Sequence, residues 1–261
     1  MSLLRDLTAG ALEDAGRRRA ERPLSAVESA ATDRAPAIDA LAALAPADRV
    51  RIIAEVKRAS PSRGPLADIT DPAALASSYE TGGASAISVL TEERRFGGSL
   101  ADLEAVRDAV TLPVLRKDFI AEPYQVFEAR ASGADIVLLI VAALEQPELR
   151  SLYDLVTSLG MTALVETHSA DEVERALDIG AGLVGVNARD LGTFELDQEL
   201  FGSLAGRIPS GVIRVAESAV KSAADVAHYR RAGADVVLVG EALVTDGDPA
   251  RTLAAFLSAG K

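Results

Sequence analysis

The sequence predicts an α/β fold: a (β/α)8 TIM barrel preceded by an N-terminal helical extension. From residue 51 onward, short apolar runs rich in β-branched residues alternate with longer amphipathic stretches, a pattern typical of repeated βα units. Eight such units occupy roughly 210 residues, the size expected of a closed barrel. A Gly-Ala pair also recurs at intervals of roughly 50 residues, before every second predicted strand.

The chain before the first predicted strand forms the extension. Apolar residues recur at helical spacing over residues 2–20 and predict a helix whose apolar stripe needs a surface to pack on. Residues 21–48 are polar, contain three prolines and are expected to hold at most one short helix, near 37–44. We therefore divide the chain into an extension, residues 1–48, that packs on the top of the barrel, and a single barrel domain, residues 49–261.

The alternating pattern sets the expected elements. The predicted strands lie near residues 51–57, 85–90, 113–117, 135–141, 161–166, 183–187, 212–217 and 235–239. The predicted helices lie near residues 72–81, 99–110, 122–132, 146–159, 170–179, 197–207, 221–231 and 248–258. Two of these helices begin with a serine three positions before an acidic residue, at Ser169 and Ser222, which is the spacing of a capping box.

The recurring glycines help to choose between two α/β architectures. Gly83, Gly133, Gly180 and Gly233 each precede an alanine and then a predicted strand. Glycine suits the end of a helix because it accepts the left-handed conformation. The alternative fold, a doubly wound open sheet, usually has a glycine-rich dinucleotide turn after its first strand, and this sequence has none. The barrel is therefore favoured.

The composition excludes several functional classes. The 261 residues are 49% apolar and 25% charged, which is ordinary for a globular domain. A formal net charge of −12 leaves no basic stripe for a phosphate backbone, so no nucleic-acid partner is expected. Without cysteines there is no disulfide, thiol nucleophile or thiolate metal site. Neither a signal peptide nor a membrane-length apolar run is evident, so we expect a cytoplasmic protein.

Charged residues end four of the predicted strands, and side-chain alternation along each strand places them on its inward face. They are Glu55 and Lys57 on the first strand, Lys117 on the third, Glu166 on the fifth and Glu217 on the seventh, with the polar Asn187 ending the sixth. Alternate strands of a barrel contribute to the same interior layer, and barrel enzymes place their active sites at the carboxyl ends of the strands. We therefore expect an active site there.

The residue types limit the chemistry of that site. The two histidines, His168 and His228, have no second histidine at ligand spacing and are interpreted as surface or packing residues. No metal site and no Ser-His-Asp set is predicted. Lysine and glutamate remain as acids and bases, whose pKa values depend on burial and on each other. The two lysines also form a cationic patch that attracts an anionic substrate.

A phosphate site is expected beside these groups. Phosphate in such barrels commonly binds at the loops after the seventh and eighth strands. Those loops contain Ser218 and Ala219, and Gly240 and Glu241, while Ser60 in the first loop adds a hydroxyl from across the barrel. An ordinary turn glycine is the alternative explanation of Gly240. Glu241 would repel phosphate unless its side chain points away.

Several motifs resemble one known family. They are IAEVKRASPS at residues 53–62, FGGS at 96–99, LRKDF at 115–119, VETH at 165–168, GVNARDL at 185–191 and AES at 216–218. Together they resemble the indole-3-glycerol-phosphate synthase family over nearly the whole chain. The resemblance implies conversion of 1-(2-carboxyphenylamino)-1-deoxyribulose 5-phosphate to indole-3-glycerol phosphate, CO₂ and water, the ring-closing step of tryptophan biosynthesis, with no cofactor or metal.

The resemblance also implies roles for individual residues. Lys117 resembles the general acid of ring closure and Glu166 its acid–base partner. Lys57, oriented by Glu55, resembles the group that binds the substrate carboxylate and helps the later dehydration; the division of that dehydration among Lys57, Glu55 and Glu166 is left open. The implied substrate-binding residues are Asn187, Glu217, Ser218, Phe119 and Arg189, and the expected phosphate-binding residues are Ser60, Ala219, Gly240 and Glu241.

One residue departs from the family pattern, which usually has glycine after Glu-Ser in the seventh loop. Ala219 stands there and keeps its N–H donor for phosphate provided that its φ is negative. Two alternatives to a synthase stay open. Another phosphate-binding barrel enzyme of aromatic amino-acid biosynthesis is one, although a phosphoribosylanthranilate isomerase would need a cysteine base. A non-catalytic barrel is the other. The sequence is compatible with a monomer.

Overall fold

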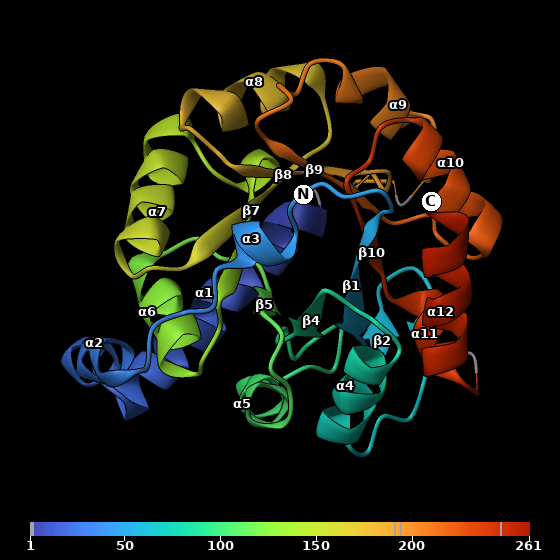
Figure 1. Ribbon diagram of the computed structural model, residues 1–261. Helices are drawn as coiled ribbons and strands as arrows, with labels where there is room; N and C mark the ends of the chain where they lie inside the picture. The colour runs from blue at the N-terminus through green and yellow to red at the C-terminus, as the bar shows by residue number, and fades with distance from the viewer. Residues whose placement is uncertain (1–2, 191, 194, 246) are drawn as a thin grey trace.

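A closed parallel barrel forms the centre of the molecule (Figure 1). The computed structural model describes residues 3–190, 192–193, 195–245 and 247–261. The barrel strands are β1 (Arg51–Val56), β4 (Ala86–Leu90), β5 (Val114–Lys117), β6 (Ile136–Ile140), β7 (Thr162–Thr167), β8 (Leu183–Asn187), β9 (Ile213–Glu217) and β10 (Val236–Val239). Each pairs in parallel with its neighbours, and β1 closes the ring by pairing with both β10 and β4. The predicted barrel is confirmed, and the open sheet is wrong.

Helices follow the strands and surround the barrel (Figure 1). They are α4 (Pro72–Thr81), α5 (Leu100–Ala109), α6 (Pro123–Ala131), α7 (Gln146–Ser158), α8 (Ala170–Asp178), α9 (Leu200–Ala205), α10 (Ala223–Arg231) and α12 (Pro249–Ala259). Within the barrel domain, elements that the sequence did not predict are the short hairpin of β2 (Ala59–Ser60) and β3 (Gly64–Pro65), the 3-10 turn η1 (Val141–Ala143) and α11 (Glu241–Thr245). Within the described residues, no helix has the length and hydropathy needed to cross a bilayer.

The helix-ending glycines behave as their sequence context predicts. Gly83, Gly133, Gly180 and Gly233 all have positive φ, between 82° and 97°. At the other end of a helix, Ser222 begins α10 with a complete capping box. Local sequence signals therefore fix both where several helices start and where they turn back toward the next strand.

The N-terminal extension contacts the barrel at more than one place. It contains α1 (Leu3–Glu21), α2 (Leu24–Asp33) and α3 (Ala40–Ala43); the predicted first helix began at residue 2, which lies outside the described residues. The expectation of at most one short helix after residue 20 is wrong, because α2 begins directly after Pro23. Proline is favoured at a helix start, so this proline delimits α2 rather than excluding it.

The three helices of the extension pack against different parts of the barrel. Leu4 and Leu7 of α1 join the apolar cluster inside the barrel, as does Leu44 directly after α3. α2 runs alongside α6 and buries Val27. The backbone N–H of Ile38, before α3, donates to a carboxylate that precedes β6, so α3 lies at the amino ends of the strands. In Figure 1, α3 lies over the middle of the barrel.

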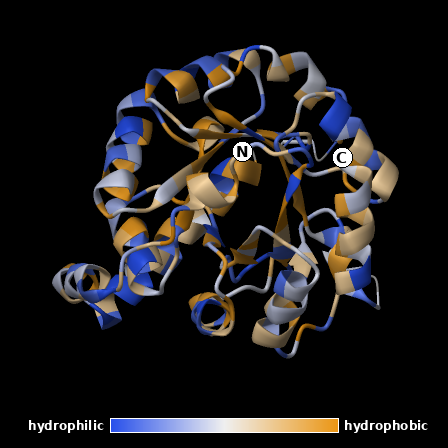
Figure 2. Cartoon of the chain, viewed as in Figure 1, coloured by the Kyte–Doolittle hydropathy of each residue, from blue (hydrophilic) through white to orange (hydrophobic). Residues whose placement is uncertain are grey.

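Two apolar layers make up the core. One lies between the strands and the surrounding helices, and the other fills the barrel interior. Figure 2 shows mainly hydrophobic strands and helices with mixed faces. The interior includes one fully buried residue from each of four alternate strands: Ile53, Leu115, Leu164 and Val215. Each lies two residues before a charged strand end, so the charged groups stand directly above a dry apolar layer.

Candidate active site

The charged strand ends open into one cavity of about 410 Å³ at the carboxyl ends of the strands. All of the catalytic, substrate-binding and phosphate-binding residues expected from the sequence line this cavity. Leu191, the last residue of the GVNARDL motif, lies outside the described residues. Apolar side chains line the cavity as well, including Phe119, which packs against Phe96 with ring centroids 6.3 Å apart, and Leu3 and Leu7 of α1. The cavity thus combines an apolar wall with a charged floor.

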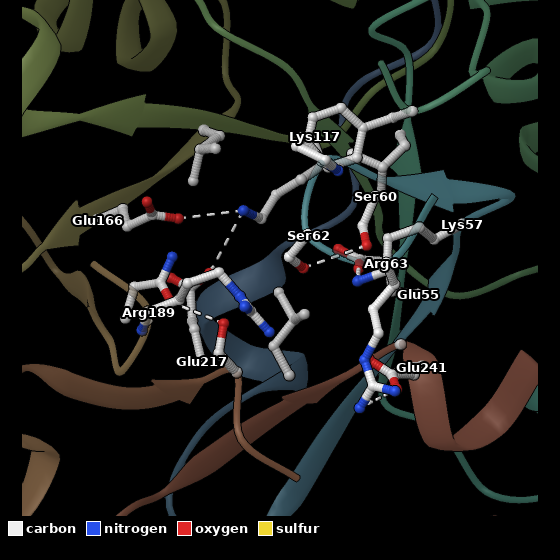
Figure 3. Close-up of a pocket in the computed structure, with 18 of the residues that line it drawn as sticks. Glu55, Lys57, Ser60, Ser62, Arg63, Lys117, Glu166, Arg189, Glu217 and Glu241 are labelled. Atoms are coloured by element: carbon white, nitrogen blue, oxygen red, sulfur yellow. Dashed lines mark hydrogen bonds and ion pairs between the residues drawn. The ribbon is translucent and has the colours of Figure 1, made fainter. Parts of the chain in front are cut away.

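Lys117 occupies the centre of that floor (Figure 3). Its Nζ lies 3.0 Å from Glu166 Oε2 and 3.5 Å from Glu217 Oε2. Burial opposes the ammonium charge, but the carboxylates of Glu166, Glu217 and Glu55 outweigh it and raise the pKa of Lys117 above its ordinary value. Lys117 is therefore a proton-bearing ammonium at neutral pH.

The two carboxylates beside Lys117 differ in proton affinity. Burial alone would raise the pKa of Glu166, but the charges of Lys117 and His168 hold it below its usual range. Burial and the neighbouring Glu166 carboxylate raise the pKa of Glu217 to about 8, against the opposing effect of Lys117. At neutral pH the site therefore holds one ionised and one protonated carboxyl group around a single ammonium, and these pKa values suit acid–base chemistry.

Glycine in β8 makes space for Glu217. A Cβ at Gly185 would overlap Glu217 Oε1 and would also crowd Leu164. That oxygen is buried, and among the described residues no group bonds to it. The absence of a side chain at position 185 is therefore what lets the Glu217 carboxyl group fit against β8.

A second lysine–glutamate pair ends β1. Lys57 Nζ lies 2.7 Å from Glu55 Oε1, while Glu55 Oε2 accepts a hydrogen bond of 3.2 Å from Ser88 Oγ. Gly240, at the end of β10, passes close to this pair: a Cβ there would lie 2.6 Å from Glu55 Oε1 and 3.0 Å from Lys57 Nζ. The missing side chain at Gly240 therefore makes room for the ion pair, a reason that the sequence did not reveal.

Asn187 connects two loops of the cavity. Its Oδ1 accepts a hydrogen bond of 2.7 Å from Ser218 Oγ and one of 3.0 Å from the backbone N–H of Arg189. Burial lowers the pKa of Arg189, with the charge of Arg63 acting in the same direction and Glu241 against it. Two arginines and one glutamate therefore meet at this side of the cavity.

The expected phosphate loops form the rim. Ser60 Oγ lies 3.4 Å from Ser62 Oγ on the hairpin after β1, and Arg63 Nη2 on the same hairpin lies 3.1 Å from Glu241 Oε1 (Figure 3). The Glu241 charge is thus paired with an arginine. Arg63 was not singled out in the sequence, although it is the basic residue that follows the Ser-Pro-Ser turn.

Ala219 adopts a conformation that the sequence analysis did not expect. Its φ is +58°, and the preceding Ser218 has φ +70°, so the condition of a negative φ is not met. The left-handed region costs an L-residue roughly 1–2 kcal/mol because Cβ crowds the following carbonyl oxygen. Glycine would adopt this turn without that strain, which gives a physical reason for the glycine that the family pattern usually has after Glu-Ser.

The two histidines lie in different settings. His228 Nε2 lies 3.5 Å from Glu199 Oε1 on the outer helices, and its side chain is partly exposed, in agreement with the surface interpretation. His168 is partly buried, with Nε2 3.4 Å from Glu166 Oε1, and the surface or packing interpretation did not foresee this position beside the site. Its place two residues after Glu166 was the available signal. Within the described residues, no group of three or more histidines or carboxylates is arranged to hold a metal ion.

Together, the fold and the site define a closed βα barrel that carries ion-paired lysines and glutamates at the carboxyl ends of alternate strands, where barrel enzymes place their active sites. The model of a protein family described as indole-3-glycerol phosphate synthase matches residues 4–256. The chain therefore belongs to the indole-3-glycerol phosphate synthase family.

Individual proteins show the same likeness. An indole-3-glycerol phosphate synthase from Leifsonia xyli subsp. xyli is 77% identical over 256 residues, 98% of this chain and 98% of that protein. One from Beutenbergia cavernae is 58% identical over 260 residues, 100% of this chain and 96% of that protein. Among solved structures, 3-hexulose-6-phosphate synthase from Salmonella typhimurium has a TM-score of 0.62 at 16% identity over 80% of this chain and 98% of that chain, which shows the shared fold.

Proposed function

We propose that this protein catalyses the indole-3-glycerol-phosphate synthase reaction of tryptophan biosynthesis. The substrate is 1-(2-carboxyphenylamino)-1-deoxyribulose 5-phosphate, and the products are indole-3-glycerol phosphate, CO₂ and water. Family membership supports the reaction, and the arrangement of Lys117 between Glu166 and Glu217 carries its mechanism. The protein is therefore a carboxy-lyase that works with side chains alone.

Lys117 is the general acid of ring closure. The aromatic carbon that carries the carboxylate attacks the ketone carbon, and the Lys117 ammonium gives a proton to the ketone oxygen as that bond forms. Loss of CO₂ then restores the aromatic ring. The raised pKa of Lys117 supports this role because it keeps the proton in place until charge develops on the oxygen. Glu166, 3.0 Å from Nζ, is the acid–base partner in the steps that follow.

Lys57 binds the substrate carboxylate. Its ammonium is held by Glu55 at 2.7 Å and still faces the cavity, so it adds positive charge beside the leaving CO₂ group. The same pair takes part in the dehydration, in which the hydroxyl formed at ring closure leaves as water and a proton is removed to complete the indole. Glu166 shares that task.

The remaining lining residues position the substrate. Asn187, Glu217, Ser218 and Arg189 offer polar groups, and Phe119 offers an apolar face for the aromatic ring.

The substrate phosphate binds at the rim of the cavity formed by the loops after β1, β9 and β10. Ser60 and the backbone N–H groups of Ala219 and Gly240 bind the phosphate, since all three line the cavity near the loops that follow β1, β9 and β10. The positive φ of Ala219 is the turn conformation that glycine would adopt, so Ala219 keeps the backbone N–H of that turn in spite of the strain. Pairing of Glu241 with Arg63 supports this because it removes the repulsion that a free carboxylate would exert.

The extension is part of the working enzyme. Residues 1–48 pack on the single barrel domain, residues 49–261, and α1 contributes Leu3 and Leu7 to the cavity wall. Arg18 of α1 is anchored by hydrogen bonds of 2.6 and 2.9 Å to the Glu128 carboxylate on α6. The location expected from the sequence is the cytoplasm, no nucleic-acid partner is expected, and the chain is compatible with a monomer.

The test is direct conversion of the substrate. Purified protein is mixed with the carboxyphenylamino substrate, and the fluorescence of the indole product and released CO₂ are followed together. We expect one CO₂ for each indole-3-glycerol phosphate. A folded protein that forms no indole product would overturn the proposal.

A further inference from the structure

One face of α1 joins the cavity wall to a buried charge. Leu3 and Leu7 lie on this face and line the cavity. Gly10 and Asp14 follow at helical spacing and are buried, so they continue the same face toward the carboxyl half of the helix. The Asp14 side chain is 6% exposed, and a carboxylate that is so deeply buried needs a partner.

The partner is Arg94, in the loop between β4 and α5. Its Nε lies 2.9 Å from Asp14 Oδ2 and its Nη2 lies 2.6 Å from Asp14 Oδ1, so two nitrogens of the guanidinium hold the carboxylate. Glu13 and Arg17, on the neighbouring positions of α1, extend this cluster. The hydrogen bonds from Arg94 hold the pKa of Asp14 below its ordinary value, against the effect of burial. Asp14 is therefore ionised at neutral pH.

Glycine at position 10 gives Arg94 room to lie along the helix. A Cβ there would lie 3.2 Å from Arg94 Nη1 and 3.4 Å from Arg94 Cδ, closer than the roughly 3.5–4.0 Å of optimal contact. At Gly16, in the same helix, an added Cβ would meet nothing within 4 Å. Glycine inside a helix is destabilising relative to alanine. The approach of Arg94 therefore gives a packing reason for Gly10.

The loop that carries Arg94 is held by its own hydrogen bonds. The buried carboxylate of Glu92 accepts hydrogen bonds of 3.1, 2.7 and 3.0 Å from the backbone N–H groups of residues 94–96. The backbone N–H of Thr91, where the loop begins, donates to the carbonyl oxygen of Lys117 at 3.1 Å. The position of Arg94 is therefore fixed relative to β5.

Phe96, in the same loop, completes an apolar wall. It packs against Phe119, and both rings line the cavity together with Leu3 and Leu7. These four side chains belong to one apolar cluster. The benzene ring of the proposed substrate is the part of that molecule that an apolar wall favours.

A second ion pair of α1 makes the Asp14 contact decisive for this wall. Arg18 is bonded to Glu128 on α6. Leu7 lies about 16 Å along the helix from Arg18, so a tilt of a few degrees about Arg18 moves Leu7 by about 1 Å. Asp14 lies between these two positions, and its pairing with Arg94 opposes the tilt. Without that pair, the amino half of α1 is released while Arg18 still holds the helix to the barrel.

We propose that Asp14 and Arg94 form a latch, here named the α1 latch, that holds the apolar wall in place for the benzene ring of the substrate. The inference rests on the proposed function and adds two positioning residues to it. Neither residue lines the cavity, so both act through Leu3, Leu7 and Phe96. The α1 latch therefore contributes to substrate binding and not to proton transfer.

The variants change either the charge or the space of the α1 latch. Asp14→Asn and Arg94→Gln each remove one charge of the pair, and the double variant removes both. Gly10→Leu keeps both charges but fills the space along which Arg94 lies. Circular dichroism and urea unfolding check that each variant is folded.

Two controls match these variants. Asp178→Asn removes the acidic partner of another ion pair, in which Asp178 lies 2.9 Å from Arg150 on the outer helices. Gly16→Leu adds the same side chain to α1 at a position with open space. We expect both controls to keep the wild-type kcat and KM.

The α1 latch predicts a change in KM without a change in kcat. We expect each charge variant and Gly10→Leu to raise KM by about fivefold or more, which is about 1 kcal/mol of binding free energy, with kcat within about twofold. A higher KM at constant kcat is the result of losing binding that substrate and transition state share. The double variant should raise KM no further than the larger single effect, because either change opens the same latch.

Two further measurements separate the α1 latch from a general structural role. The inhibition constant of inorganic phosphate should stay at its wild-type value in every variant, because the phosphate loops follow β1, β9 and β10. Amide hydrogen exchange should become faster in α1 and in residues 91–97 of the latch variants, while the barrel strands stay as protected as in wild type. A general structural role would weaken phosphate inhibition and strand protection as well.

Several results would overturn the α1 latch. They are a wild-type KM in both folded single charge variants, additive effects on KM in the double variant, and phosphate inhibition that weakens together with substrate binding. If Asp14→Asn does not fold, the KM values of Arg94→Gln and Gly10→Leu against their controls decide. Failure of the proposed function is distinguishable, because the wild-type protein would then form no indole product, while hydrogen exchange would still report whether the pair holds α1.

Discussion

Replacing Gly240 with alanine should damage catalysis by displacing the Lys57–Glu55 pair. The new Cβ would lie 2.6 Å from Glu55 Oε1 and 3.0 Å from Lys57 Nζ, whereas carbon atoms pack at roughly 3.5–4.0 Å. One or both side chains must therefore move by roughly 1 Å. That displacement is enough to cost about 10²-fold in rate, or about 2.7 kcal/mol of activation free energy.

Gly240→Ala should also lower the free energy of unfolding, but by no more than the cost of one added methyl group. Inserting a methyl group into a packed site typically costs about 1–3 kcal/mol. Gly211→Ala is the matched control, because its added Cβ meets nothing within 4 Å. We expect Gly211→Ala to leave both kcat and the free energy of unfolding close to wild type.

The assay is kcat and KM from indole fluorescence, together with the inhibition constant of inorganic phosphate. If Gly240→Ala lowers kcat while phosphate still inhibits at near wild-type concentrations, the space for Lys57 and Glu55 is what matters. The reasoning fails if kcat at saturating substrate is unchanged and only phosphate inhibition weakens. That result would mean that Gly240 serves the phosphate and not the ion pair.

Three further changes have expected outcomes. Ala219→Gly should raise the free energy of unfolding by up to about 1 kcal/mol, because relief of the positive φ outweighs the flexibility of glycine. The control Ala254→Gly, within α12, should lower the free energy of unfolding by about 1 kcal/mol. A lower free energy of unfolding in both variants would refute the strain at Ala219. Arg116→Ala should lower the free energy of unfolding in urea by about 3–5 kcal/mol, because the Arg116 guanidinium is fully buried between carboxylates. The control Arg150→Ala, at an exposed ion pair, should lower it by under about 1 kcal/mol. Equal losses of unfolding free energy in the two variants would contradict this reasoning. A histidine whose pKa is raised by folding stabilises the fold fully below its unfolded pKa, and this stabilisation is lost as the pH rises through its folded pKa. Because the pKa of His168 is raised to about 10, His168→Gln should lower the free energy of unfolding more at pH 6.5 than at pH 10. An equal effect at both pH values would argue against the ion pairs of His168.

The alternation of strand side chains predicted much of the site. Because inward residues recur every second position, the sequence placed Lys57, Lys117, Glu166 and Glu217 on one layer, and the structure brings them into one cavity. Arg116, one position before Lys117, points away from the cavity as the same alternation requires, and it contacts α6 through Glu128. Periodicity predicts direction but not partners, so the buried ion pairs of Arg116 could not be foreseen.

Other features depend on contacts between distant segments. The Arg63–Glu241 pair joins residues 63 and 241 across the cavity rim, and no local pattern indicates it. α2 is stabilised by packing on α6, which outweighs its proline-flanked, polar sequence. His168 was interpreted as a surface or packing residue because a histidine needs known neighbours before a role can be assigned. Its neighbours became known only once β7 and α8 were placed.

The central claim is that Lys117 donates the proton of ring closure, and Lys117→Ala tests it most directly. The exposed Lys261→Ala is the matched control, since it removes the same side chain at the C-terminus. We predict that kcat of Lys117→Ala falls by at least about 10²-fold, which is about 2.7 kcal/mol, with the fold retained by circular dichroism and substrate binding only moderately weakened. Lys261→Ala should keep wild-type kcat. A near wild-type kcat in folded Lys117→Ala would contradict the account and move the search for the acid to Lys57.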